Sequence, residues 1–273
     1  MTSSPSDSGQ PPESGHDPSV AHSARVWNYW LGGKDNYKID RVVAQEVADT
    51  FPVIVDIARQ ARLFLYRAIR YLVVEAGVRQ FLDIGTGLPT ANNTHQIAQG
   101  MAPQARIVYV DNDPLVLVHA RALLTSCPEG ATDYVEADVR DHDTILREAA
   151  KTLDFAQPIG LMMLGILGYI PDSDNPQAIV SRLLDPLPSG SYLVIDDGTD
   201  TDPACVEAIH AYNQNPDSAS SYHLRSPEEI ARYFDGLELV EPGVVSSSRW
   251  RPEPNAWGEP AEIPDYAGVG RKP

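Results

Sequence analysis

Hydrophobic and polar positions along this chain follow two different periods, and the change comes near Gln80. Between residues 52 and 76, apolar residues recur at steps of three and four, which predicts one long helix packed on a core. Residues 40–50 predict a shorter helix before it. After Gln80, short apolar runs alternate with amphipathic stretches, which is typical of strands that alternate with helices. Continuous apolar strands of this kind favour a parallel sheet covered on both faces.

The predicted fold is therefore α/β, a Rossmann-like, doubly wound, mostly parallel sheet preceded by an N-terminal helical arm or lid. Seven strands are predicted, the last at an antiparallel edge: 81–84, 107–110, 132–137, 159–164, 192–195, 237–240 and 266–270. We expect residues 1–17 to be a disordered tail, because they are polar and rich in Ser, Pro and Gly. Residues 18–273 are expected to form one domain, with a helical segment (18–78) and a Rossmann-like core (79–273).

Charge, apolar content and cysteine spacing argue against several classes of partner. The formal net charge is −17 and Lys and Arg form no cluster, so a nucleic-acid substrate is not expected. The sequence has no apolar run of membrane-spanning length, and its polar start lacks the pattern of a signal peptide. Cys127 and Cys205 stand alone, without zinc-ligand spacing. These features predict a cytoplasmic protein with no metal and no membrane partner.

A glycine turn follows the first predicted strand, and the rest of the chain is organised around it. Gly85 and Gly87 lack a Cβ, so the backbone can turn sharply and a ligand can approach it closely. The helix that follows should direct its N–H groups and the positive end of its dipole towards the turn. The stretch therefore predicts a seat for an anionic, nucleotide-like ligand.

Residues that directly follow the predicted strands should share one edge of the sheet, where ligands of such folds bind. They are Gly85, Thr86, Gly87, Asp111, Asn112, Asp138, Val139, Leu164, Asp196 and Asp197. A carboxylate after the second strand can accept hydrogen bonds from both hydroxyls of a ribose, and Asp138 can contact an adenine amino group. A single Asp here would be a cap or turn residue, but the series describes an adenosine pocket.

The choice of adenosine ligand depends on two positions. The dinucleotide fingerprint has a third glycine where this chain has Thr90. Asp83 precedes the turn, and a carboxylate suits a pyrophosphate poorly. It suits a ligand that carries an ammonium and a carboxylate, such as the methionine end of S-adenosylmethionine.

Three stretches resemble an actinobacterial family of S-adenosyl methyltransferases, long listed as a domain of unknown function, within the class I S-adenosylmethionine-dependent methyltransferases. They are residues 24–36 (Ala-Arg-Val-Trp-Asn-Tyr-Trp-Leu-Gly-Gly-Lys-Asp-Asn), 81–90 (Phe-Leu-Asp-Ile-Gly-Thr-Gly-Leu-Pro-Thr) and 108–114 (Val-Tyr-Val-Asp-Asn-Asp-Pro). The resemblance runs from about Ala21 to the end. It implies a class I methyltransferase domain that binds S-adenosylmethionine and releases S-adenosylhomocysteine. It does not imply a substrate.

Candidates for catalysis and substrate binding come from the arm and the strand ends. Tyr29, Tyr169, Asp196 or Asp197 could remove a proton from an acceptor, and His22 or His223 could do so if the arms fold over the site. An aromatic cluster is expected to bind a small, apolar or aromatic acceptor, or a cationic one, unless it only packs on the core: Trp27, Tyr29, Trp30 and Tyr37. Trp250 and Trp257 could add a second wall, or only pack.

The resulting hypothesis is an S-adenosylmethionine-dependent methyltransferase acting on a small molecule. A non-catalytic sensor of S-adenosylmethionine or S-adenosylhomocysteine is one alternative, since methyl transfer requires no particular catalytic residue. A nicotinamide-dependent reductase is the other, and Thr90 argues against it. An enclosed second cavity beside the transferred methyl group would favour the enzyme over the sensor.

Overall fold

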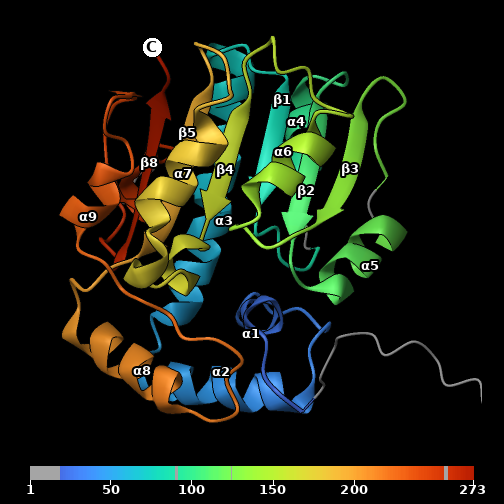
Figure 1. Cartoon of the computed structure of the whole chain (residues 1–273). Helices are drawn as coiled ribbons and strands as arrows, with labels where there is room; N and C mark the ends of the chain where they lie inside the picture. The colour runs from blue at the N-terminus through green and yellow to red at the C-terminus, as the bar shows by residue number, and fades with distance from the viewer. Residues whose placement is uncertain (1–18, 90–91, 124, 255–257) are drawn as a thin grey trace, which may run out of the picture.

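One mixed β-sheet lies at the centre of the computed structural model, which describes residues 19–89, 92–123, 125–254 and 258–273 (Figure 1). Its strands, in their order across the sheet, are β3 (Ala131–Glu136), β2 (Arg106–Asp111), β1 (Gln80–Ile84), β4 (Gly160–Leu164), β5 (Tyr192–Gly198), β8 (Asp265–Arg271) and β6 (Glu238–Leu239). A further short strand, β7 (Val245–Ser246), also pairs with β8.

The direction of the strands confirms the predicted fold class. Strands β1 to β5 are parallel, and β8 runs antiparallel to β5, β6 and β7. The last predicted strand is thus antiparallel as expected, but it lies between β5 and β6 and not at the edge of the sheet. The described residues give eight strands, where the sequence predicts seven. The additional strand is β7, whose two-residue pairing with β8 is too short to leave a periodic signal.

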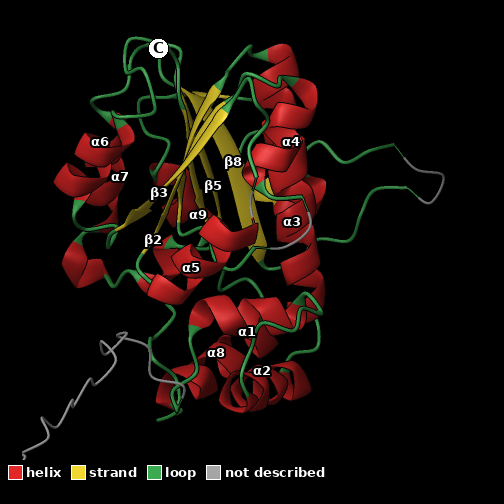
Figure 2. Cartoon of the chain, turned by 90° about the vertical axis from the view of Figure 1, so that its right-hand side faces the viewer, coloured by secondary structure: helices red, strands yellow, loops and turns green. Residues whose placement is uncertain are grey.

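Helices surround the sheet on both faces and at one end (Figures 1 and 2). In chain order they are α1 (Ser23–Trp30), α2 (Lys38–Thr50), α3 (Ile54–Arg70), α4 (Thr94–Met101), α5 (Pro114–Leu123), α6 (His142–Ala149), α7 (Pro176–Leu184), α8 (Pro203–Gln214) and α9 (Pro227–Arg232). One π-helical turn, η1 (Tyr71–Glu75), continues α3, and three 3₁₀ turns are η2 (Leu167–Tyr169), η3 (Asp172–Asp174) and η4 (Ser247–Arg249).

Two apolar cores lie on opposite faces of the sheet. Helices α6, α7 and α9 cover one face, through Ile145, Val180 and Ile230 among others. Helices α3 and α4 cover the other face, with Phe64 and Trp250 among the residues of its core. Figure 2 shows the two groups of helices on either side of the sheet. Both faces are covered because successive residues of each strand point to opposite faces and are apolar on both.

A third apolar core lies beyond the carboxyl ends of the parallel strands. It joins α1, α2, the first half of α3 and α8, as Figure 1 shows. The arm that carries α1 is also tied to the loop after α8: Ala21 N donates to the carbonyl of Asp217 at 2.7 Å, and Ala219 N donates to the carbonyl of Ala21 at 2.9 Å. This end of the molecule is therefore built from segments far apart in the sequence.

A buried ion pair fixes the arm to α2. Arg25 Nε lies 2.9 Å from Asp40 Oδ2 and 3.0 Å from Oδ1, and the two residues are 2% and 0% exposed. The same carboxylate accepts hydrogen bonds from the backbone N–H groups of His22 and Tyr37. Arg25 Nη1 also lies 3.8 Å from Asp113 Oδ2, in the loop after β2. The charge of Arg25 thus connects the arm to an edge of the sheet.

The sequence also predicts a disordered tail, a division at residue 78 and no membrane-spanning segment. The expected disordered tail, residues 1–17, lies outside the described residues, and the division at residue 78 remains a prediction. Within the described residues, none of the helices combines the length and the apolar character that crossing a membrane requires.

Candidate functional site

A cavity of about 430 Å³ lies where the parallel strands end, between the sheet and the third core. Residues Asp83, Asp111, Leu164 and Asp196 reach it from β1, β2, β4 and β5. Helices α1, α2, α3 and α8 supply most of the opposite wall. Its volume falls in the range of about 300–1,000 Å³ that is usual for small-molecule sites.

The glycine turn forms the floor of this cavity. Gly85 and Gly87 have φ angles of 72° and 66°, in the left-handed region that favours glycine. Gly85 N donates to the carbonyl of Val110 at 2.8 Å, which holds the turn against β2. A Cβ added to Gly85 would lie 2.7 Å from Cδ1 of Ile166, so the turn and the loop after β4 pack without spare room.

The helix after the turn does not present its N-terminus as an anion seat, contrary to the expectation from sequence. Helix α4 begins at Thr94, and Asn93 forms a capping box with Gln96. The next amide, His95 N, donates to the hydroxyl of Tyr109 at 2.8 Å. Because protein groups already satisfy the amides of Asn93, His95 and Gln96, these three are not available to a ligand. Thr90 lies outside the described residues.

Asp111 occupies the end of β2 and faces the cavity. Its Oδ2 accepts a hydrogen bond from Gly87 N at 2.9 Å, and its Oδ1 accepts one from Asp113 N at 2.9 Å. The residue is 7% exposed, and burial raises the pKa of its carboxyl to about 6, against the opposing effect of these hydrogen bonds. The carboxylate is thus fixed in place and ionised at neutral pH.

Arg62, on α3, is a cation beside the ends of β1 and β5, and the sequence analysis did not single it out. Its Nη2 donates to the carbonyl of Asn92 at 2.7 Å, and its charge acts on both Asp83 and Asp196. Asp83 accepts a hydrogen bond from Thr94 Oγ1 at 2.6 Å, and burial raises its pKa to about 6. Arg62 comes from the stretch predicted only as a core helix, so no motif marks it.

The residues predicted after β3 lie at the other end of the cavity. Asp138 and Val139 line it, and so does Asn112 from the loop after β2. Asp138 Oδ1 lies 3.0 Å from Arg140 Nη1, and Arg140 Nε in turn lies 2.7 Å from Asp174 Oδ2. This chain of ion pairs orients the Asp138 carboxylate beside the buried side chain of Val139.

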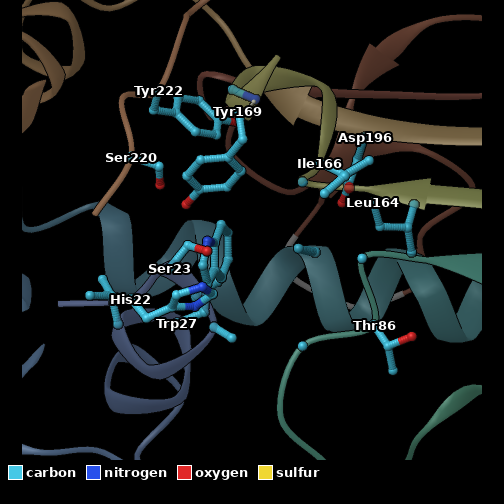
Figure 3. Close-up of a pocket in the computed structure, with 18 of the residues that line it drawn as sticks. His22, Ser23, Trp27, Thr86, Leu164, Ile166, Tyr169, Asp196, Ser220 and Tyr222 are labelled. Carbon is cyan, nitrogen blue, oxygen red and sulfur yellow. Dashed lines mark hydrogen bonds between the residues drawn. The ribbon is translucent and has the colours of Figure 1, made fainter. Parts of the chain in front are cut away.

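Asp196 and Asp265 place two buried carboxyls at the edge of β5 and β8. They are 1% and 4% exposed, and both line the cavity. Burial raises the pKa of Asp196 well above its ordinary value, with Asp265 and Asp197 adding to the effect, and it raises the pKa of Asp265 to about 8. In Figure 3, Asp196 lies beside Leu164 and Ile166. Asp265 is a further residue that the sequence analysis did not single out.

Aromatic side chains from α1 and η2 line another part of the cavity. Trp27, Trp30 and Tyr169 all line it, and the Trp27 and Trp30 rings meet edge to face with centroids 5.6 Å apart. Figure 3 shows Tyr169 pointing towards Trp27 and Ser23. Burial raises the pKa of the Tyr169 phenol well above its ordinary value, so this group keeps its proton and can serve as a hydrogen-bond donor rather than as a base.

Several other candidates lie outside the residues that line the cavity. Tyr29 donates its hydroxyl to Gln45 Oε1 at 2.9 Å, and Tyr37 is 40% exposed with its ring beside Arg25. Two further residues face elsewhere, since Asp197 binds Tyr222 and Gly168 N on the other face of the sheet, and His223 does not reach the cavity.

The remaining candidates, one histidine and two tryptophans, also lie in different places. His22 lines the cavity, with Nδ1 3.3 Å from Asp113 Oδ2. Trp250 is a core residue, packed edge to face on Phe64 with centroids 5.3 Å apart. Trp257 lies outside the described residues.

Known structures resemble this chain over almost its whole length. A DUF574 family protein from Streptomyces avermitilis is 43% identical, with a TM-score of 0.86, covering 93% of this chain and 98% of its own. A candidate methyltransferase from Thermobifida fusca is 41% identical, also with a TM-score of 0.86, covering 96% of this chain and 98% of its own. No curated protein matches the sequence.

A more distant structure shares the fold. The plantazolicin methyltransferase BpumL, solved with S-adenosylhomocysteine and a triazolic substrate analogue, has a TM-score of 0.53 at 13% identity, covering 92% of this chain and 96% of its own. The model of the S-adenosyl methyltransferase family matches residues 10–273. These results confirm the resemblance seen in the sequence: the chain belongs to the S-adenosyl methyltransferase family, whose cofactor is S-adenosylmethionine.

Proposed function

We propose that this protein transfers a methyl group from S-adenosylmethionine to a small-molecule acceptor. The observation that carries the proposal is the lining of the cavity. Beyond the glycine turn and Asp111, it continues into an apolar chamber, which we define as Val26, Val47, Ile54, Ile57, Cys205 and Ile209. A cofactor with a charged amino-acid end and a polar nucleoside has no need of such walls, so the chamber supports a second, apolar ligand.

The residues of the site fit the cofactor. Asp111 would accept hydrogen bonds from the ribose hydroxyls, and Arg62 would bind the carboxylate of the methionine end. Val139 and Asp138 would contact the adenine. When bound, S-adenosylmethionine supplies an electrophilic methyl group on a positively charged sulfur. The chain itself orients the acceptor and keeps water from it, with Trp27 and the apolar chamber closing over the strand ends.

The same chamber favours an enzyme over a sensor. A protein that only detects S-adenosylmethionine needs room for that ligand alone, whereas this cavity extends between α1, α2 and α8. The net charge of −17 argues against a nucleic-acid acceptor, which further supports a small one.

Calorimetric titration with S-adenosylmethionine, S-adenosylhomocysteine and NADH in parallel tests the cofactor, and methyl transfer from labelled S-adenosylmethionine to a panel of small molecules tests the reaction. We expect binding of the first two ligands and none of NADH. Binding of NADH alone would contradict the proposal. Binding of the adenosyl ligands without transfer to any acceptor would favour the sensor.

Asp111→Ala should weaken binding of S-adenosylhomocysteine by about 1–3 kcal/mol, because the variant lacks two charge-assisted hydrogen bonds to the ribose. Titration calorimetry measures the loss. Asp143→Ala, at a side chain that is 87% exposed, is the matched control and should bind like the wild type. Equal affinity of the two variants would show that the ribose lies elsewhere.

The affinity for S-adenosylhomocysteine should fall as the pH drops below about 6. Only the ionised Asp111 can accept both ribose hydroxyls, and its pKa of about 6 means that protons compete with the ligand below that value. Among the neighbouring groups, the amides of Asp113, Gly87 and Asn112 lower this pKa, and the charge of the Asp113 carboxylate raises it. Titrations between pH 5 and 8 should show a plateau above pH 7, and Asp111→Asn should flatten the decline.

A further inference from the structure

Three buried carboxyl oxygens in the cavity make no hydrogen bond of ordinary length and angle among the residues that the structure describes. They are both oxygens of Asp196 and Oδ2 of Asp265, although the amide of Gly165 acts on the first carboxyl and the hydroxyl of Ser247 on the second. A buried polar atom without a partner costs about 1–3 kcal/mol, so natural sites rarely retain several of them without a ligand. The proposed methyl transfer, as described so far, uses none of the three.

The two carboxyls point into the same space. In the register of β5 and β8, Asp196 pairs with Ala267 and Gly198 pairs with Asp265. Asp196 and Asp265 are therefore diagonal neighbours on one face of the sheet, with backbones about 7–8 Å apart. Because β8 runs antiparallel, its first residue reaches the edge where β5 ends. The cationic side chain of Arg62 faces Asp196 from α3.

The pair stands between the glycine turn and the apolar chamber. Strand β4 alone separates β5 from β1, so Asp196 lies roughly 10 Å across the sheet from the strand that leads into the turn. On its other side, Asp265 and Cys205 of the chamber line the same cavity, and burial, with the charges of Asp202 and Asp265, raises the pKa of that thiol to about 12. A molecule seated in the chamber would thus direct its polar end to the carboxyls and to the cofactor.

We propose that the methyl acceptor is a primary amine with an apolar body, whose ammonium group binds to Asp196 and Asp265 while the body fills the apolar chamber. This inference rests on the proposed function and adds the substrate class to it. A primary ammonium has three N–H donors, which matches the three unpartnered oxygens. A hydroxyl has one donor and would leave two of them unsatisfied.

Charge supports the same assignment. At the carboxyl ends of the strands, Arg62 is the neighbouring cation, and it acts on Asp83 as well as on Asp196. Burial keeps the carboxyls of Asp196 and Asp265 protonated. The positive charge of a bound ammonium would stabilise their ionised form. A neutral acceptor brings no such compensation, and an anionic one would be repelled.

The carboxyl pair can also accept the proton that must leave the ammonium before methyl transfer. An ammonium has no lone pair, so it first transfers one proton to the Asp196 carboxylate, whose raised pKa suits a proton acceptor. The amine nitrogen then forms the bond to the methyl carbon as the carbon–sulfur bond breaks with its electron pair on sulfur. The products are a methylated ammonium and S-adenosylhomocysteine.

Binding of amine probes tests the proposal without requiring turnover. With S-adenosylhomocysteine at saturation, hexylamine, 2-phenylethylamine and tryptamine would each be titrated beside the alcohol of the same skeleton. We expect at least one amine to bind at least tenfold more tightly than its alcohol. Asp196→Asn and Asp265→Asn should each remove at least tenfold of that affinity, whereas Asp143→Asn, at an exposed carboxyl, should change nothing.

Repeating the titration at pH 7 in buffers of different ionisation enthalpy provides a second readout. Binding of the ammonium should release up to one proton from the carboxyl pair, and each Asn variant should reduce the release. Since asparagine has the shape of a protonated aspartate, both variants should fold, which thermal melting checks.

Three outcomes would overturn the assignment. If no amine binds better than its alcohol, the acceptor is not an amine. If Asp196→Asn and Asp265→Asn leave amine affinity unchanged, the amine binds elsewhere. If they instead weaken S-adenosylhomocysteine tenfold, the pair holds the amino group of the cofactor itself. Failure of the wild type to bind S-adenosylhomocysteine at all would be a different result, because it would contradict the proposed function.

Discussion

Asp40→Ala should destabilise the protein by about 3–5 kcal/mol, because it removes the carboxylate that lies nearest to the buried charge of Arg25. Both side chains of the pair are almost fully buried, so water cannot screen the loss. The variant also removes the acceptor of two backbone N–H groups, those of His22 and Tyr37. Denaturant unfolding measures the change in stability, and hydrogen exchange should show that α1 opens first.

The exposed pair Arg59–Asp56 is the matched control. Its two side chains are each 65% exposed, with Arg59 Nη1 3.1 Å from Asp56 Oδ1, so Asp56→Ala should cost only about 0–1 kcal/mol. The double variant Arg25→Met with Asp40→Leu should recover most of the stability, since it removes both buried charges. Equal effects of Asp40→Ala and Asp56→Ala would show that burial of the first pair has no energetic role.

Gly85→Ala should both destabilise the fold and weaken S-adenosylhomocysteine at least tenfold. A left-handed backbone costs an alanine about 1–2 kcal/mol. The new methyl group would also meet Ile166, at 2.7 Å from Cδ1 and 3.2 Å from Cβ, and such overpacking adds about 1–3 kcal/mol. Ile166 lines the cavity, so its displacement reaches the ligand.

Gly77→Ala separates the backbone strain from the contact. Gly77 has the same φ of 72° as Gly85, but an added Cβ would meet nothing within 4 Å, and the residue lies outside the lining of the cavity. Gly77→Ala should therefore show the loss of stability due to strain, with unchanged affinity for S-adenosylhomocysteine. If both variants bind S-adenosylhomocysteine equally, the turn at Gly85 does not form the floor of the ligand site.

Most of the fold could be predicted because its strands are long and apolar on both faces. Strands β1, β2 and β4 are buried almost throughout, so their runs stand out in the sequence, and Gly85 and Asp111 follow them at fixed places. Strand β7 gave no such signal, because two residues carry no period.

The parts of the site that the sequence missed depend on tertiary geometry. Arg62 reaches the strand ends only because α3 crosses that edge of the sheet, and Asp265 does so only because β8 runs antiparallel. Helical phase explains the arm: Ser23, Trp27 and Trp30 follow one face of α1 and line the cavity, whereas Tyr29 lies on another face and turns to Gln45.

The contacts between the arm and the loop after α8 affect how members of this family can diverge. Residues 19–50 and 203–222 contribute α1, α2 and α8, and Asn215 Nδ2 donates to Glu46 Oε2 at 2.8 Å across them. Neither segment contains a strand of the central sheet. In the proposed enzyme, selection can therefore remodel the fit to the apolar body of the acceptor in this pair of segments, while Asp196, Asp265 and the strands that hold the cofactor stay as they are. A chimaera that receives both segments from a relative should shift towards the acceptor bodies that the relative prefers and keep the preference for an amine.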